Sequence, residues 1–193
     1  MKDLSKVENY AVVIDMINGF VKYGNMHDKE IASIIPAQIN LLNKFQDEKS
    51  VIGIVKDSHN KNCVEFLSYP EHCVRGTGEE NIVDELKKFE NDDSLIYEKN
   101  STSIAHVGSF FEDIRKMTNL KRITVVGCCT DICVLQAAIP IKTFLNEYDL
   151  DVEVIVPKNM VETYNAPNHN RDEYNEIAFK LMANAGIKVV EEL

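Results

Sequence analysis

The sequence has no run of roughly 18 consecutive apolar residues, the length that a helix needs to cross a bilayer. Its first six residues also lack the apolar segment of a secretory signal. Positive charge is scarce: 21 basic against 31 acidic side chains give a formal net charge of −10, with no basic patch. Nucleic acids and anionic membrane surfaces would be repelled, so neither is expected as a partner. A small substrate that is neutral or modestly charged fits this balance better.

Cysteine is present in the wrong number for a disulfide scaffold. Five cysteines cannot all pair within one chain, and a protein of 193 residues needs no covalent staples to hold its core. We therefore expect free thiols and a cytoplasmic location. In that compartment a cysteine fills the core, binds a metal or acts as a nucleophile.

Short apolar runs alternate with longer stretches that have helical spacing. The apolar runs are mostly continuous and β-branched, which is typical of strands covered on both faces; they are 10–14, 51–55, 94–97, 123–126, 152–156 and 188–190. The helical stretches are 31–45, 81–89, 110–117, 132–146 and 172–185. This order predicts an α/β fold: a single domain over residues 1–193, with a mainly parallel six-stranded sheet and helices on both faces.

Local signals mark the ends of two of these helices and two functional loops. Ser109 and Glu112 have the spacing of a capping box at the start of the third helix. Gly186 is placed to end the last helix. The irregular stretches 56–80 and 159–171 are longer than ordinary loops, and long loops on an α/β domain often carry function.

Reactive side chains follow the strands directly. Asp15 follows the first strand, Asp57 and His59 the second and Lys99 the third, while Cys133 lies near the start of the helix after the fourth. Ligands of open α/β sheets bind at the carboxyl ends of the strands, so these side chains should converge. Each alone also fits a structural role, as a turn cap, a surface cation or a core residue. Together, an acid, a cation and a thiol at a helix start can form a nucleophilic site.

Three motifs resemble those of the isochorismatase-like cysteine hydrolases. The sequence Asp-Met-Ile-Asn-Gly-Phe at 15–20 is similar to the family's Asp-x-x-Asn-x-Phe, and Lys99 matches its lysine. The sequence Gly-Cys-Cys-Thr-Asp-Ile-Cys-Val at 127–134 resembles its Gly-x-x-Thr-Asp-x-Cys-Val. The likeness extends over nearly the whole chain. It implies the isochorismatase-like fold and a triad of Asp15, Lys99 and Cys133. It also implies an oxyanion hole from the N–H groups of Cys129 and Cys133, and a cis peptide bond before Cys129.

The segments 57–59 and 69–77 are similar to the nicotinamidase (pyrazinamidase) branch of this family, in which such residues bind a divalent metal. The implied ligands are Asp57, His59, His72 and, as in some members, Glu65. The residues themselves agree in part, because a carboxylate and two imidazoles suit zinc foremost, or iron or manganese. Two alternatives stay open: a polar loop without metal, and a mixed structural zinc site that includes Cys63 and Cys73.

The resemblance implies an amidase that releases ammonia from nicotinamide and leaves nicotinate, a step of pyridine nucleotide salvage and NAD metabolism. Phe20 and Tyr69 occupy family positions that line the ring pocket, although Phe20 fits plain core equally well. Another family amidase, acting on a carbamoyl, ureido or hydrazide substrate, is the first alternative. Isochorismate cleavage would leave Cys133 without a role as nucleophile. A non-catalytic binding or thiol-redox protein is the alternative of a different class. The expected partner is a small-molecule amide, and a homo-oligomer remains open.

Overall fold

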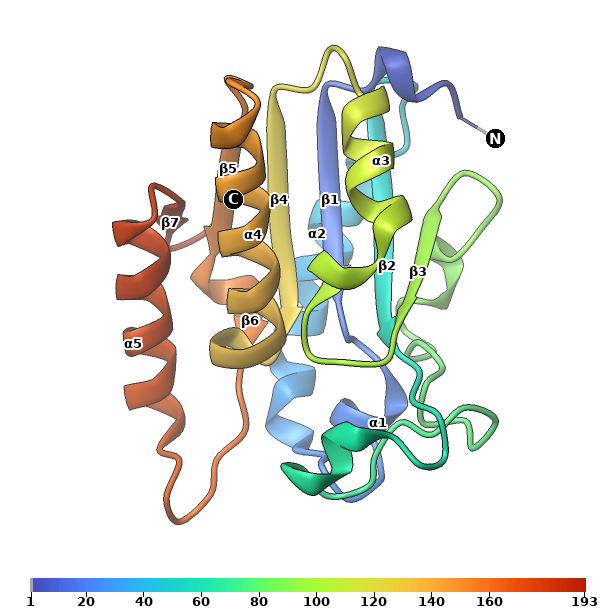
Figure 1. Cartoon of the computed structure of the whole chain (residues 1–193), viewed down its shortest axis with the longest axis vertical. Helices are drawn as coiled ribbons and strands as arrows, with labels where there is room; N and C mark the ends of the chain where they lie inside the picture. Colours follow the sequence, from blue (N-terminus) through green and yellow to red (C-terminus); the bar gives the residue numbers. More distant parts are fainter. Residues whose placement is uncertain (1) are drawn as a thin grey trace.

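The strands form one parallel sheet in the computed structural model, which describes residues 2–193 (Figure 1). They are β1 (Asn9–Ile14), β2 (Ser50–Asp57), β3 (Leu95–Lys99), β4 (Arg122–Cys128), β5 (Glu153–Pro157), β6 (Val161–Glu162) and β7 (Lys188–Val190). Their order is β3-β2-β1-β4-β5-β7, and the short β6 pairs with the end of β4. The predicted six-stranded parallel sheet is confirmed, with β6 as an additional strand. Because β1 lies between β2 and β4, the crossovers change direction there, where ligands of open α/β sheets bind.

Helices cover both faces of the sheet, as the sequence predicts for a single α/β domain. They are α1 (Asn18–Val21), α2 (Ile35–Asn43), α3 (Gly108–Lys116), α4 (Leu135–Glu147) and α5 (Arg171–Asn184). Alternate side chains of β1 point to opposite faces: Tyr10 and Val12 pack in the core layer under α3, α4 and α5, and Ala11 and Val13 in the layer with α1 and α2. Figure 1 shows α3 and α4 in front of the sheet and α2 behind it. No helix within residues 2–193 is both long and apolar enough to span a bilayer.

The prediction of a helix over residues 81–89 is wrong. Only Lys87–Phe89 forms a short 3₁₀ turn, although the buried side chains in this stretch have helical spacing. The backbone pairs with the segment after β1 instead: the Val83 N–H donates to the Met16 carbonyl at 3.0 Å, and Ile82 bridges Ile17. These tertiary hydrogen bonds override the local periodicity.

The two predicted helix ends have different outcomes. The prediction of a capping box from Ser109 and Glu112 is wrong. Helix α3 begins at Gly108, and Ser109 therefore lies inside its first turn. The residue that caps α3 is Val107, and its side chain makes no capping hydrogen bond. At the end of α5, Gly186 has φ +86° and its N–H donates to the Ala183 carbonyl at 3.0 Å, which confirms its role as a helix stop.

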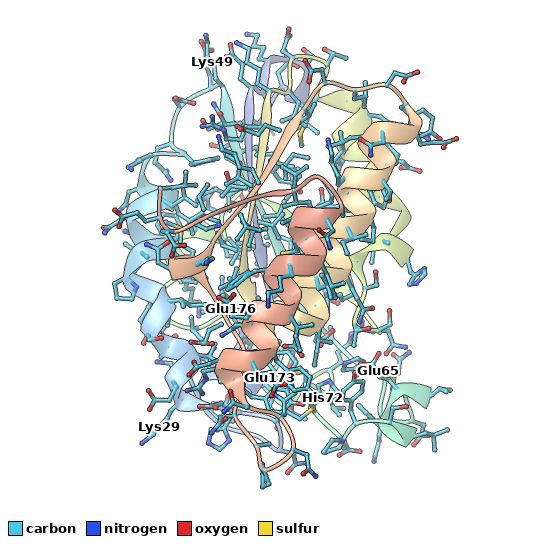
Figure 2. The ribbon with its side chains drawn as sticks, turned by 90° about the vertical axis from the view of Figure 1, so that its left-hand side faces the viewer. Lys29, Lys49, Glu65, His72, Glu173 and Glu176 are labelled. Atoms are coloured by element: carbon cyan, nitrogen blue, oxygen red, sulfur yellow. The ribbon has the colours of Figure 1, made fainter. Side chains whose placement is uncertain are left out.

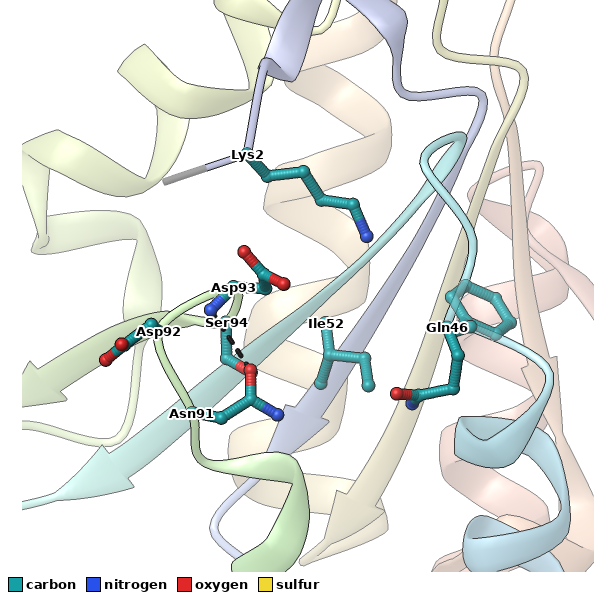
Figure 3. A pocket seen from close by; sticks show the side chains of 8 residues that line it. Lys2, Gln46, Ile52, Asn91, Asp92, Asp93 and Ser94 are labelled. Carbon is teal, nitrogen blue, oxygen red and sulfur yellow. Dashed lines mark hydrogen bonds between the residues drawn. The ribbon is translucent and has the colours of Figure 1, made fainter.

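A cavity of about 470 Å³ lies near the amino ends of β2 and β3 (Figure 3). Its lining residues are Lys2, Phe45, Gln46, Ile52, Asn91, Asp92, Asp93 and Ser94. Its two carboxylates are exposed, and the lining contains neither a thiol nor a histidine. The reactive groups identified in the sequence lie at the other end of the strands.

Gly127 of β4 lies opposite Ile14 of β1. Its φ of +125° is in the region that favours glycine, and a Cβ built on it would lie 2.0 Å from the Ile14 carbonyl oxygen. The neighbour is backbone of a central strand and cannot move aside. Gly108, at the start of α3, has no atom within 4 Å of such a Cβ.

We therefore expect opposite effects from the same substitution at these two glycines. Gly127→Ala should lower the free energy of unfolding by at least about 2 kcal/mol, through backbone strain and overpacking. Gly108→Ala should be neutral or stabilising by up to about 1 kcal/mol, since it reduces the entropy of the unfolded chain. Urea unfolding followed by circular dichroism measures both. A Gly127→Ala protein as stable as the wild type would contradict the close approach of β1 and β4.

Candidate active site

Four reactive side chains meet at the carboxyl ends of the central strands. Asp15 follows β1 directly, while Asp57 and Lys99 are the last residues of β2 and β3 and face each other in register. Cys133 lies in the single π-helical turn Thr130–Val134 that joins β4 to α4. The side chains that the sequence analysis assigned to the triad therefore converge, as parallel strands require of residues at their carboxyl ends.

The Lys99 ammonium lies at the centre of this cluster. Its Nζ is 2.7 Å from Asp15 Oδ2, 2.5 Å from Asp57 Oδ1 and 3.7 Å from Cys133 Sγ. The Asp57 N–H donates to Asp15 Oδ1 at 2.9 Å. Cys133 Sγ lies within 4.8 Å of a carboxylate oxygen of Asp15. All four residues are at most 5% exposed, so solvent screens these interactions little.

Burial and charge set the protonation of the cluster. Burial and the Asp57 charge raise the pKa of Asp15 to about 6, against the opposing effect of Lys99. Burial lowers the pKa of Lys99, but Asp15 and Asp57 outweigh it and hold the pKa well above its ordinary value. Burial also raises the pKa of the Cys133 thiol well above its usual range, although Lys99 opposes this. The resting cysteine is therefore a thiol beside a carboxylate that can exchange a proton near neutral pH.

A second cluster adjoins the first through Asp57. His59 Nε2 lies 3.6 Å from Asp57 Oδ2 and 3.7 Å from Glu65 Oε1. His72 Nε2 lies 3.8 Å from the same Asp57 oxygen and 3.9 Å from the same Glu65 oxygen. The two imidazole nitrogens and the two carboxylate oxygens thus surround one point. Figure 2 shows Glu65 and His72 at the same end of the molecule, away from Lys49 at the amino ends of the strands.

The donor atoms of this second cluster fit a divalent metal. Asp57 Oδ2, His59 Nε2 and Glu65 Oε1 are buried and have no hydrogen-bond partner among residues 2–193. Unpaired buried polar atoms are costly, and a cation between them would satisfy all three. His72 Nδ1 is 2.7 Å from the Pro70 carbonyl, which places the proton on Nδ1 and leaves Nε2 free to bind a metal. Nitrogen and oxygen donors of this kind suit zinc, iron or manganese.

The mixed site with cysteine ligands is not formed. Cys63 Sγ lies 3.5 Å from the Asn100 carbonyl, and the Cys73 side chain packs against Gly19. Neither thiol belongs to a group of three metal-ligating atoms in the part of the chain that the structure describes. The five cysteines are free thiols.

A narrow cavity of about 20 Å³ is lined by residues of both clusters. Its lining includes the two predicted aromatic residues, and the rings of Phe20 and Tyr69 lie 5.6 and 6.3 Å from the His72 ring. Thr102, three residues after Lys99, also lines the cavity. The sequence analysis did not identify two further lining residues, Met26 and Ile132. Met26 lies in a loop without a motif, whereas Ile132 stands in the nucleophile motif itself.

Cys129 also lines this cavity, and the peptide bond between Cys128 and Cys129 is cis, as the resemblance implies. Cys128 is fully buried, and its thiol donates to the Asp15 carbonyl at 3.2 Å. The oxyanion hole formed by the N–H groups of Cys129 and Cys133 stays a prediction.

Known proteins resemble this chain over almost its full length. The Isochorismatase domain family matches residues 10–191. Nicotinamidase 1 of Arabidopsis thaliana is 31% identical over 173 residues, which cover 82% of this chain and 70% of the relative. The pyrazinamidase of Pyrococcus horikoshii, solved in complex with zinc, is 25% identical with a TM-score of 0.73, covering 95% and 99% of the two chains. The N-carbamoylsarcosine amidase of Thermoplasma acidophilum is 20% identical with a TM-score of 0.72, covering 95% and 94%. The chain belongs to the isochorismatase family.

Proposed function

We propose that this protein is a cysteine amidohydrolase that converts nicotinamide into nicotinate and ammonia. The observation that carries the proposal is the placement of two clusters on one cavity: a thiol with its acid and ammonium, and a set of four metal-ligating side chains. The likeness to a nicotinamidase and to a zinc-bound pyrazinamidase supports it. The proposal includes a role in NAD metabolism and a cytoplasmic location, and the free thiols agree with that location.

The first half of the reaction forms a thioester on Cys133. The Asp15 carboxylate accepts the thiol proton while the sulfur attacks the amide carbon, and the carbonyl electron pair moves to its oxygen. The N–H groups of Cys129 and Cys133 stabilise this oxyanion. Asp15 then gives the proton to the nitrogen, the C–N bond breaks and ammonia leaves. A cysteine suits this step because one difficult hydrolysis becomes two easier ones.

The second half of the reaction releases the acid. Water attacks the thioester carbon and Asp15 accepts one of its protons. The C–S bond then breaks, the sulfur regains a proton from Asp15, and the carboxylic acid leaves. The Lys99 ammonium lies 2.7 Å from the Asp15 carboxylate and 3.7 Å from the Cys133 sulfur. It therefore stabilises negative charge on either group throughout the cycle.

The metal-ligating side chains serve orientation in this proposal. Asp57, Glu65, His59 and His72 would hold a divalent metal, with zinc as the first candidate. When bound, the metal supplies a Lewis-acidic position that a pyridine ring nitrogen can occupy. Phe20 and Tyr69 then bury the two faces of the ring and leave the amide directed at the thiol.

A carbamoyl or ureido compound is the second candidate substrate. Thr102 places a polar side chain in the cavity lining, where its N–H donates to Glu65 Oε2 at 2.9 Å and its Oγ1 lies 2.9 Å from Gln136 Oε1. A polar wall of this kind suits a ureido group better than an aromatic ring. Ammonia release measured with nicotinamide, pyrazinamide and several carbamoyl compounds separates the two candidates.

The nucleophile is tested by Cys133→Ala. Loss of the sulfur removes the covalent route, so we expect no measurable ammonia release from a protein that is folded and still binds metal. Mass spectrometry of an early-quenched wild-type reaction should show an acyl adduct on Cys133. Cys63→Ala is the matched control and should keep its activity. Full activity in Cys133→Ala, or an adduct on another cysteine, would overturn the mechanism.

The metal site is tested by His72→Ala. Removal of one of the four ligands should lower metal affinity at least about tenfold, because the remaining donors coordinate the ion incompletely. Metal content after dialysis against a weak chelator, measured by plasma mass spectrometry, reports this without any substrate. The control is His106→Ala, at an exposed histidine outside the cluster. Equal metal content in both variants would mean that the ligands lie elsewhere.

The ring pocket is tested by Phe20→Leu, which keeps an apolar side chain but removes the flat face. Aromatic contact contributes about 0.5–1.5 kcal/mol, so KM for nicotinamide should rise about 2- to 12-fold while kcat changes little. Phe45→Leu, at the cavity near the amino ends of the strands, is the control. An unchanged KM in Phe20→Leu would assign Phe20 to the core alone.

A further inference from the structure

One polar network beside the nucleophile has no part in the reaction described above. Asp131 lies two residues before Cys133, in the same π-helical turn. The Thr163 hydroxyl donates to Asp131 Oδ1 at 2.5 Å, and His169 Nε2 lies 2.9 Å from Asp131 Oδ2. Both oxygens of this carboxylate are thus held by the segment 163–169, which follows β6.

The His169 ring is enclosed on both faces and at both nitrogens. It stacks on Tyr164 with ring centroids 3.8 Å apart and on Tyr174 with centroids 3.7 Å apart. Its Nδ1 lies 3.0 Å from the Tyr164 carbonyl, an acceptor, and its Nε2 faces the Asp131 carboxylate. Both ring nitrogens therefore face an acceptor, and both ring faces pack against tyrosine rings. The side chains of His169 and Asp131 are only 9% and 11% exposed.

The segment that carries His169 is itself fixed to the sheet. At its start, Val161 and Glu162 of β6 pair with Gly127 and Cys128 of β4. At its end, Arg171 Nε donates to the Thr163 carbonyl at 2.9 Å, and the same guanidinium contacts Asp28 at 2.5 Å. The segment therefore offers the nucleophile turn a rigid support.

The turn has few other polar ties to the rest of the fold. The N–H groups of Ile132 and Val134 both donate to the Cys129 carbonyl, which is local. The buried Thr130 hydroxyl has no partner among the residues that the structure describes. Apart from Cys133 itself, Asp131 is thus the side chain through which the turn is hydrogen-bonded to a distant segment.

We propose that His169 is a positioning residue for the amide hydrolysis. Through its hydrogen bond with Asp131 it holds the turn that carries Cys133, and so keeps the sulfur near Lys99 and the substrate carbonyl. His169 is not among the residues that line the cavity, and its hydrogen bond to Asp131 connects it to the turn that carries Cys133. This inference rests on the proposed function, in which a misplacement of about 1 Å at the reacting atoms can cost about 10² in rate.

Two substitutions separate the hydrogen bond from the aromatic stack. His169→Phe keeps a flat ring between the two tyrosines but cannot donate to Asp131. His169→Gln loses the ring but keeps an N–H donor. We expect kcat for ammonia release, per folded and metal-loaded site, to fall about 10- to 100-fold in His169→Phe with KM changed less than twofold. His169→Gln should retain clearly more kcat than His169→Phe, and the control His106→Phe should equal the wild type.

Hydrogen exchange of the peptide with residues 129–134, followed by mass spectrometry, tests the same inference without substrate. Exchange should be faster in His169→Phe than in His169→Gln or the wild type. If the wild type releases no ammonia from any amide, the proposed function fails and hydrogen exchange alone decides on the positioning role. A His169→Phe protein with wild-type kcat, or with unchanged hydrogen exchange in this peptide, would overturn the positioning role of His169. If His169→Phe does not fold, Thr163→Val removes the other contact to Asp131 and should raise the same exchange.

Discussion

The buried ion pairs of Lys99 hold the candidate site together. An ammonium that is 2% exposed is stable only when its charge is compensated. Asp57 on the neighbouring strand β2 and Asp15 just after β1 supply the negative charge. The two oxygens of Asp57 contact different groups: Oδ1 faces Lys99, and Oδ2 faces the histidines of the metal-ligating cluster. The nucleophilic and metal-ligating halves of the site therefore share one carboxylate. Removal of that carboxylate would leave the buried Lys99 ammonium with Asp15 as its remaining carboxylate partner on one side, and an incomplete ligand set on the other.

The parallel sheet makes this arrangement possible. β3, β2, β1 and β4 are adjacent, and their carboxyl ends present Lys99, Asp57, Asp15 and the turn of Cys133 side by side. Reactive groups from distant parts of the sequence thus meet without long loops of their own. The long loop after β2 adds Glu65 and His72, and the segment after β6 contacts the nucleophile turn from the other side. The candidate site consequently lies at the switch point between β1 and β4, at the carboxyl ends of the strands.

Much of the fold could be predicted from the sequence, because the β-branched runs mark buried parallel strands and the helical stretches lie between them. The convergence of Asp15, Lys99 and Cys133 also follows, since each lies at or shortly after the carboxyl end of a strand. Elements fixed by tertiary hydrogen bonds could not be predicted. Residues 81–89 pair with the backbone after β1 rather than forming a helix, and β6 is only two residues long. The contact between Asp131 and His169 joins segments 38 residues apart and carries no periodic signal.

Ammonia and nicotinate measured together, in a time course with purified and zinc-loaded protein, test most directly whether the two halves of the site act on one substrate. In the proposed function, nicotinamide binds with its ring at the metal-ligating cluster and its amide at Cys133. Both products should then appear in equal amounts, and the rate should fall when a chelator removes zinc. Absence of turnover with nicotinamide, or a rate that is the same with and without zinc, would contradict a site in which Asp57 joins the two clusters.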